Sequence, residues 1–154
     1  NDIMDILNVL EKATQINSVS GSENEIRKFI SDNVKKYCDE LSVDAMGNLI
    51  AHKKGSGKKI MFAAHMDEIG IIVTDIDDKG FVRFFAVGGL NLRNLVNLRV
   101  RFANGVEGVI GAEEESFKDK PAISKLYVDL GAADKKRLEK MFQSVIPRHL
   151  SADL

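Results

Sequence analysis

His65 and Asp67 are the residues whose types and spacing point most directly to chemistry. They follow the apolar residues 60–64, a run that indicates a buried strand ending in a histidine. An imidazole in this position can bind a metal ion, and a carboxylate two residues further on can orient the other ring nitrogen. A histidine at a strand end can equally be a hydrogen-bonded structural residue, so the spacing alone leaves both interpretations open.

The remaining histidines and the acidic run are weaker candidates for a metal site. His52 falls in a polar hairpin strand and His149 in a short tail, which favours surface positions for both. Glu113, Glu114 and Glu115 are adjacent, and neighbouring side chains of an extended segment point to opposite faces. We therefore expect a solvated acidic loop. A single histidine does not hold a catalytic zinc ion, which ordinarily takes three protein ligands.

Two amphipathic helices are expected at the start of the chain. Apolar residues recur at three- and four-residue spacing over residues 2–16 and again over residues 22–38. Ser22, with Glu25 three positions later, has the pattern of a capping box and predicts the start of the second helix.

A hairpin and a buried strand are expected next. Residues 41–51 alternate between apolar and polar types around the turn residues Gly47 and Asn48, which predicts a β-hairpin. Residues 59–64 are almost continuously apolar, and this predicts a strand buried on both faces in the middle of an α/β sheet.

After Gly70 the pattern becomes that of an all-β domain with a helix at its end. Short strands separated by glycine- and aspartate-rich turns predict a small barrel or sandwich. Asp134 can cap a final helix that Pro147 closes. The expected domains are thus residues 1–69, an α/β part, and residues 70–154, a β-domain with a terminal helix. The predicted strands cover residues 71–76, 81–87, 98–102, 106–111 and 125–130.

Composition excludes several classes of function. The chain has 154 residues, 44% of them hydrophobic, and a formal net charge of −1, which is typical of a globular protein. Scattered basic residues argue against nucleic-acid binding. The longest apolar run is far shorter than the roughly 20 residues of a membrane span. The acidic N-terminus and the single cysteine, Cys38, favour a cytoplasmic, reducing location.

Five ordered motifs resemble the N-terminal part of a known enzyme family. This family is the cytoplasmic dinuclear metallo-aminopeptidases that form tetrahedral dodecamers, also called glutamyl or deblocking aminopeptidases and, in older usage, endoglucanases. The resemblance covers roughly residues 3–132. The motifs are residues 19–23 (VSGSE), 46–50 (MGNLI), 64–70 (AHMDEIG), 87–89 (VGG) and 126–132 (LYVDLGA).

The resemblance implies a metal-dependent hydrolase that releases N-terminal residues from peptides. His65 would bind one of two divalent metal ions, such as zinc, cobalt or manganese, and Asp67 would fix its ring. A metal-activated water would attack the peptide carbonyl. The family's other ligands and its general base lie downstream of the β-domain, whereas this sequence stops at Leu154, so we expect the chain alone to be inactive. The resemblance also implies a homo-oligomer.

Two alternatives to this hypothesis stay open. The chain could be a non-catalytic assembly or ligand-binding module that associates through its β-domain, because most metal-ligand positions of the family are absent. Glycoside hydrolysis rests only on the older family name and requires two carboxyl groups across a sugar cleft, about 5 to 9.5 Å apart. No such pair is evident, and the absence of tryptophan disfavours a sugar-stacking groove.

Overall fold

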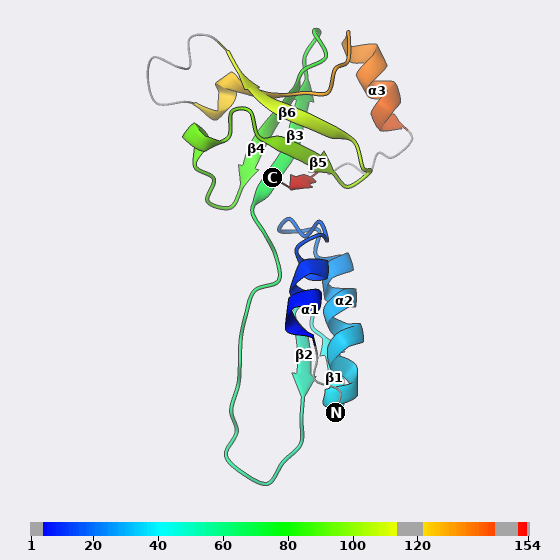
Figure 1. Ribbon diagram of the computed structural model, residues 1–154, viewed down its shortest axis with the longest axis vertical. Coiled ribbons are helices and arrows are strands. Elements are labelled where there is room, and N and C mark those ends of the chain that lie inside the picture. The colour runs from blue at the N-terminus through cyan, green and yellow to red at the C-terminus, as the bar shows by residue number, and fades with distance from the viewer. Residues whose placement is uncertain (1–4, 114–121, 144–150, 154) are drawn as a thin grey trace. The chain divides into compact units, whose positions relative to one another are not determined.

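The computed structural model describes residues 5–113, 122–143 and 151–153. The backbone forms two compact units, Asn1–Asp67 (unit 1) and Glu68–Leu154 (unit 2). Unit 1 carries two helices and a hairpin, and unit 2 consists mainly of β-strands with one helix (Figure 1). None of the described helices is long and apolar enough to cross a membrane.

Both predicted N-terminal helices are present in unit 1, but the second begins differently from the prediction. Its N-cap is Glu23, whose side chain makes no capping hydrogen bond, so the predicted capping box of Ser22 and Glu25 is wrong. The Glu23 carboxylate instead accepts the backbone N–H of Gly21 at 2.7 Å. The elements are α1 (Ile6–Ala13), α2 (Asn24–Val34) and the 3-10 turn η1 (Lys35–Tyr37).

The predicted hairpin is confirmed as the antiparallel pair β1 (Glu40–Val43) and β2 (Leu49–His52). Asp44 forms its turn, because one carboxylate oxygen accepts the backbone N–H groups of both Met46 and Asn48 at 2.9 Å. The left-handed backbone of Gly47 (φ +87°) completes the turn.

The strand predicted over residues 59–64 does not form in the described structure. These residues belong to a long irregular connection after β2 (Figure 1), and Ile60, Met61 and Phe62 are 77%, 88% and 94% exposed. A strand needs a neighbouring strand to satisfy its backbone groups. In the described part of unit 1 the two strands β1 and β2 pair with each other, so this apolar segment has neither a partner strand nor a covered face.

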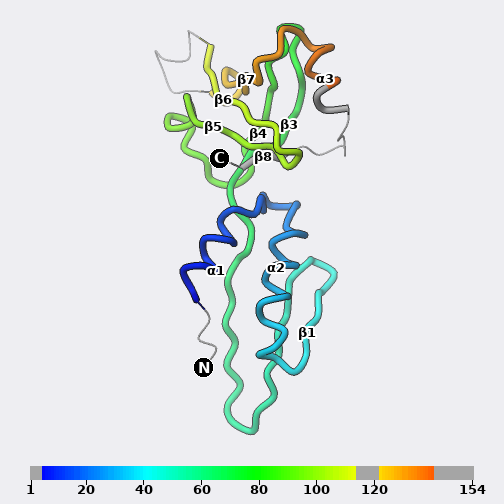
Figure 2. The backbone as a smooth tube through the Cα atoms, turned by 45° about the vertical axis from the view of Figure 1, so that its right-hand side comes forward, coloured from blue at the N-terminus to red at the C-terminus, as the bar shows by residue number. Residues whose placement is uncertain are grey.

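Unit 2 is a curled antiparallel sheet closed into a barrel (Figure 2). Five strands follow the order β3-β4-β7-β6-β5, and β8 pairs with both β3 and β5. The barrel alternative of the prediction is therefore correct, but β8 was not predicted. The strands are β3 (Gly70–Ile76), β4 (Val82–Val87), β5 (Arg99–Phe102), β6 (Glu107–Ala112), β7 (Leu126–Asp129) and β8 (Ser151–Asp153).

Alternating side chains of the strands fill the interior of unit 2. Val100 and Phe102 of β5 are each 1% exposed, whereas Arg99 and Arg101 between them are exposed. The predicted C-terminal helix is α3 (Lys135–Gln143), and its fully buried Leu138 belongs to the same core cluster. Asp134 accepts the backbone N–H of Arg137 at 2.8 Å, which confirms the predicted cap. Two further 3-10 turns are η2 (Leu92–Asn94) and η4 (Ile123–Lys125).

Candidate metal-ligand site

His65 and Asp67 lie in direct contact at the end of unit 1. The His65 Nδ1 atom lies 3.1 Å from the Asp67 Oδ1 atom and 2.9 Å from the Asp67 carbonyl oxygen. Both neighbouring oxygens are acceptors, so Nδ1–H is the donor in this contact, and Nε2 is the ring nitrogen that can offer a lone pair to a ligand. The His65 side chain is 86% exposed, which leaves Nε2 accessible to a ligand.

The Asp67 carboxylate is shared between His65 and Ser20. The Ser20 hydroxyl donates to Asp67 Oδ2 at 2.5 Å, while Oδ1 faces the imidazole. The hydrogen bond from Ser20 is the main cause that lowers the pKa of Asp67 below its ordinary value, and the hydrogen bond from His65 adds to it against partial desolvation. Asp67 is therefore ionised at neutral pH, as an acceptor from Nδ1–H requires.

The remaining histidines are not brought to this pair. His52 sits at the end of β2, where its Nδ1 atom lies 3.3 Å from a carboxylate oxygen of Glu40 across the hairpin. Its expected surface position is confirmed, since the side chain is 57% exposed. His149 lies outside the described residues.

The described residues of this chain fit one ligand of a metal site and its orienting partner. Within residues 5–113, 122–143 and 151–153, no three His, Cys, Asp or Glu side chains gather closely enough to hold an ion. The exposed Nε2 atom of His65 and the carboxylate behind its Nδ1 atom match a ligand with its orienting partner. A catalytic ion ordinarily takes three protein ligands, so these residues do not form a complete coordination sphere.

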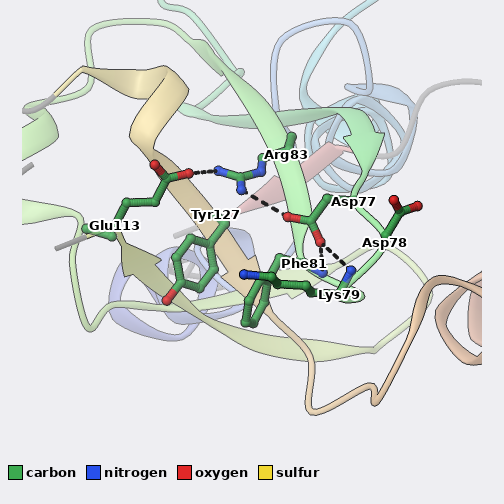
Figure 3. A pocket seen from close by; sticks show the side chains of 8 residues that line it. Asp77, Asp78, Lys79, Phe81, Arg83, Glu113 and Tyr127 are labelled. Atoms are coloured by element: carbon green, nitrogen blue, oxygen red, sulfur yellow. Dashed lines mark hydrogen bonds and ion pairs between the residues drawn. The ribbon is translucent and has the colours of Figure 1, made fainter. Parts of the chain in front are cut away.

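Glu113 follows β6 and belongs to a charged network in unit 2, although its side chain is still 38% exposed to solvent. Its two carboxylate oxygens lie 3.0 Å from Arg83 Nη1 and 3.0 Å from Lys125 Nζ. Figure 3 shows Arg83 between Glu113 and Asp77, and the Arg83 Nη2 atom lies 2.9 Å from Asp77. Hydrogen bonds from Lys125 and then from Arg83 lower the pKa of Glu113. Glu114 and Glu115 lie outside the described residues.

The same network lines a cavity of about 530 Å³ in unit 2. The ring centroids of Phe81 and Tyr127 are 4.3 Å apart, and the Arg83 guanidinium lies 5.7 Å from the Tyr127 centroid. The sequence did not indicate that Arg83 and Glu113 pair, because the two residues are 30 positions apart. Charge-assisted hydrogen bonds thus hold Arg83 of β4 between Asp77, which follows β3, and Glu113, which follows β6.

Comparisons with known proteins agree with this fold. Residues 47–146 match the M42 glutamyl aminopeptidase family. A protein of Acetivibrio thermocellus that carries an aminopeptidase name is 52% identical over 139 residues, which cover 89% of this chain and 42% of that protein. The chain therefore belongs to the M42 glutamyl aminopeptidase family, and it spans about two fifths of the length of such relatives.

Solved structures support the same assignment. An aminopeptidase from the archaeon Desulfurococcus kamchatkensis superposes with a TM-score of 0.82 at 33% identity, over 94% of this chain and 42% of that one. The Pyrococcus horikoshii TET1 peptidase, described as able to assemble into a tetrahedron or a large octahedral shell, gives a TM-score of 0.76 at 35% identity. That match covers 96% of this chain and 46% of the peptidase chain.

Proposed function

We propose that this chain is the part of a metal-dependent aminopeptidase that contributes one metal ligand, His65, together with Asp67 as its orienting carboxylate. The observation that carries the proposal is the geometry of this pair, in which Asp67 accepts from Nδ1 and leaves the Nε2 atom of His65 exposed. A divalent ion such as zinc, cobalt or manganese, when bound, would lower the pKa of a water molecule to about 7. The substrates would be peptides, cleaved at their N-terminal residue.

The two units would have different tasks in this enzyme. Residues 1–69 would form part of the α/β peptidase domain, and residues 70–154 would form an inserted β-domain of the dimerisation type. The exposed apolar residues 60–62 support the first assignment, because such a segment is normally covered in a folded domain. The covering elements and the remaining metal ligands would come from polypeptide outside these 154 residues, since relatives of the chain are more than twice as long.

A chimeric enzyme tests the role of His65. The chain replaces the matched segment of the Acetivibrio thermocellus relative, and hydrolysis of aminoacyl p-nitroanilides is measured with and without a chelator. We expect chelator-sensitive turnover that His65→Ala lowers at least about 100-fold, as for loss of a metal-site residue. His52→Ala, a histidine paired within the hairpin, is the matched control and should keep the activity.

The isolated chain provides the complementary measurement. With added zinc, cobalt or manganese it should show no turnover, because the described residues supply one ligand. Robust, chelator-sensitive hydrolysis by the isolated chain would contradict the proposal, and so would a chimera whose activity survives loss of His65.

A second candidate is a non-catalytic assembly module. It is favoured by the absence of a metal-binding cluster from the described residues and by the shell assembly of the Pyrococcus horikoshii peptidase. Association would run between copies of this chain through the β-domain. Light scattering across micromolar concentrations tests it, and a strictly monomeric chain would count against this candidate.

A further inference from the structure

Ser20 is a third residue of the His65 site, because it contacts the Asp67 carboxylate. These two residues are 47 positions apart, and the hydroxyl of Ser20 donates to the oxygen of Asp67 that does not face His65. A carboxylate rotates easily about its terminal bond, because the wells of that torsion are broad. With one oxygen held by Ser20, the other is kept in line with the His65 Nδ1 atom.

Ser20 is itself fixed in a tight turn formed by residues 19–23. The backbone N–H of Ser22 donates to the carbonyl of Val19 at 2.7 Å, which closes the turn around Ser20. Gly21 has a φ of +93°, a conformation that an L side chain rarely adopts, and its N–H donates to the Glu23 carboxylate at 2.7 Å. The turn therefore presents the Ser20 hydroxyl in a defined direction.

Burial anchors this turn to the body of unit 1. Val19 is fully buried, Ser18 before it is 5% exposed, and Ile26 in the first turns of α2 is 4% exposed. These are the buried residues of unit 1 within the part that the structure describes. The best-anchored point of unit 1 is thus the one from which Ser20 reaches Asp67.

The segment that carries His65 is irregular, since residues 55–67 form no helix or strand. The Ser20 hydroxyl joins this segment to the turn between α1 and α2 through a hydrogen bond that spans 47 positions of the chain. His65 contacts Asp67, which lies in the same segment, through both the carbonyl oxygen and the carboxylate of that residue. The Ser20 contact therefore helps to set the orientation of the Asp67 carboxylate that faces the imidazole.

We propose that Ser20 is a positioning residue of the His65 site, which holds the Asp67 carboxylate in the orientation that keeps the His65 proton on Nδ1. The inference rests on the proposed function in one respect, namely that the exposed Nε2 atom is the metal-binding atom. Ser20 itself would touch neither metal nor substrate.

The test measures the tautomer of His65 in the full chain by ¹⁵N NMR of labelled histidine, with His65→Ala to assign the signal. We expect Ser20→Ala to lower the ratio of the Nδ1–H to the Nε2–H form by roughly 2- to 10-fold, the effect of losing one hydrogen bond. Ser20→Thr keeps a hydroxyl and should retain the ratio, whereas Ser20→Val, which has the shape of the threonine variant but no hydroxyl, should lower it. Ser31→Ala in α2 is the control for a serine away from the site.

Titration with zinc chloride separates this inference from the proposed function. We expect zinc to perturb the His65 signal in the wild type and about 10-fold more weakly in Ser20→Val than in Ser20→Thr, the loss expected for a residue behind a metal ligand. Equal tautomer ratios and equal zinc responses in the Thr and Val variants would overturn the role of Ser20 and leave the ligand role of His65 intact. A tautomer shift without any zinc response in the wild type would support the Ser20 contact and contradict the proposed function.

Discussion

Units 1 and 2 differ in how they bury apolar surface. In the described part of unit 2, ten hydrophobic residues form one buried cluster, whereas in that of unit 1 the buried residues are Ser18, Val19 and Ile26. The barrel therefore contains its own hydrophobic core, the dominant favourable term in folding. Unit 1 instead exposes apolar residues of α1 and of the segment after β2, including Leu7 and Phe62.

The candidate metal-ligand site nevertheless lies in unit 1, the unit with fewer buried residues in its described part. His65 and Asp67 belong to unit 1, and a hydrogen bond from Ser20, more than burial, holds them. A site built on a weakly packed unit gains rigidity when further elements cover that unit. We infer that the barrel can be stable by itself, whereas the His65 site belongs to a unit whose described part has few buried residues.

The largest effect that tests this comparison is expected from Phe102→Ala. Phe102 is 1% exposed in the core of the barrel, so truncation should cost about 3 to 5 kcal/mol of the free energy of unfolding. Urea denaturation of the full chain gives the free energy, and amide exchange locates the loss. Exchange should accelerate in β3 to β7 and remain unchanged in α2.

Phe62→Ala is the matched control for this substitution, because Phe62 is 94% exposed. It should change the free energy of unfolding by no more than about 0.5 kcal/mol. If Phe62→Ala lowered the free energy of unfolding as much as Phe102→Ala, Phe62 would be part of a packed core, contrary to the difference between the two units.

Gly47→Ala addresses the hairpin of unit 1 and should have a smaller effect. Gly47 has a φ of +87°, and an added Cβ would lie 2.8 Å from Arg27 Nη2. Arg27 donates through Nε to the Gly47 carbonyl at 2.7 Å, so the substitution strains the turn and displaces the link to α2. We expect a loss of about 1 to 2 kcal/mol, the cost of a left-handed L-residue.

Amide exchange in the two units checks this prediction. Protection in β1 and β2 should fall, while protection in the barrel stays as in the wild type. Gly55→Ala, in a segment where a Cβ meets no neighbour within 4 Å, is the control. A loss of protection that spreads into the barrel would mean that the two units unfold together.

The strands of the barrel were predictable because the alternation and the turn residues that mark each strand lie within a few neighbouring positions of the sequence. Val100 and Phe102 alternate with arginines, and Gly105 and Gly80 mark turns between strands, so each strand is visible in a short window. The three residues of β8 were not predictable, since a strand of this length has no period and depends on pairing with β3 and β5.

The candidate site was predictable only in its adjacent residues. The spacing of His65 and Asp67 indicated their contact. The other partner of Asp67, Ser20, lies 47 residues away, and although both residues belong to motifs of the family, the motifs do not indicate that they touch. The failure over residues 59–64 has a related cause. A continuous apolar run predicts a buried strand only if neighbouring strands exist, and the sequence of the run cannot reveal whether they do.

Arg83→Met tests the ion network of unit 2 through its pH dependence. Partial burial acts to raise the pKa of Asp77, but hydrogen bonds from the Phe81 N–H and from Arg83 outweigh it and lower the pKa. The pKa of Glu113 is lowered as well. Carboxyls with a lowered folded-state pKa stabilise the fold above their ordinary pKa values, 3.8 and 4.5, and this stability is lost as the pH falls through the folded values.

We therefore expect Arg83→Met to be less stable than the wild type at neutral pH, with the difference narrowing towards about pH 3. Urea denaturation across this range measures it. Arg99→Met, which removes an exposed arginine of β5, is the control and should leave the pH dependence unchanged. A constant difference at all pH values would assign the effect to packing against Tyr127 instead of charge.

The smallest effect on stability, but an informative one, is expected from Phe62→Ser. An exposed apolar segment without a partner strand promotes open-ended association, so the variant should reduce heterogeneous, fast-sedimenting material in sedimentation velocity. Phe85→Ser, at a phenylalanine 61% exposed on β4 of the barrel, is the comparison variant. Loss of an aromatic side chain reduces association only where that side chain lies in the interface between copies. If Phe85→Ser alone removes the fast-sedimenting material, the interface therefore lies on the barrel and not on unit 1.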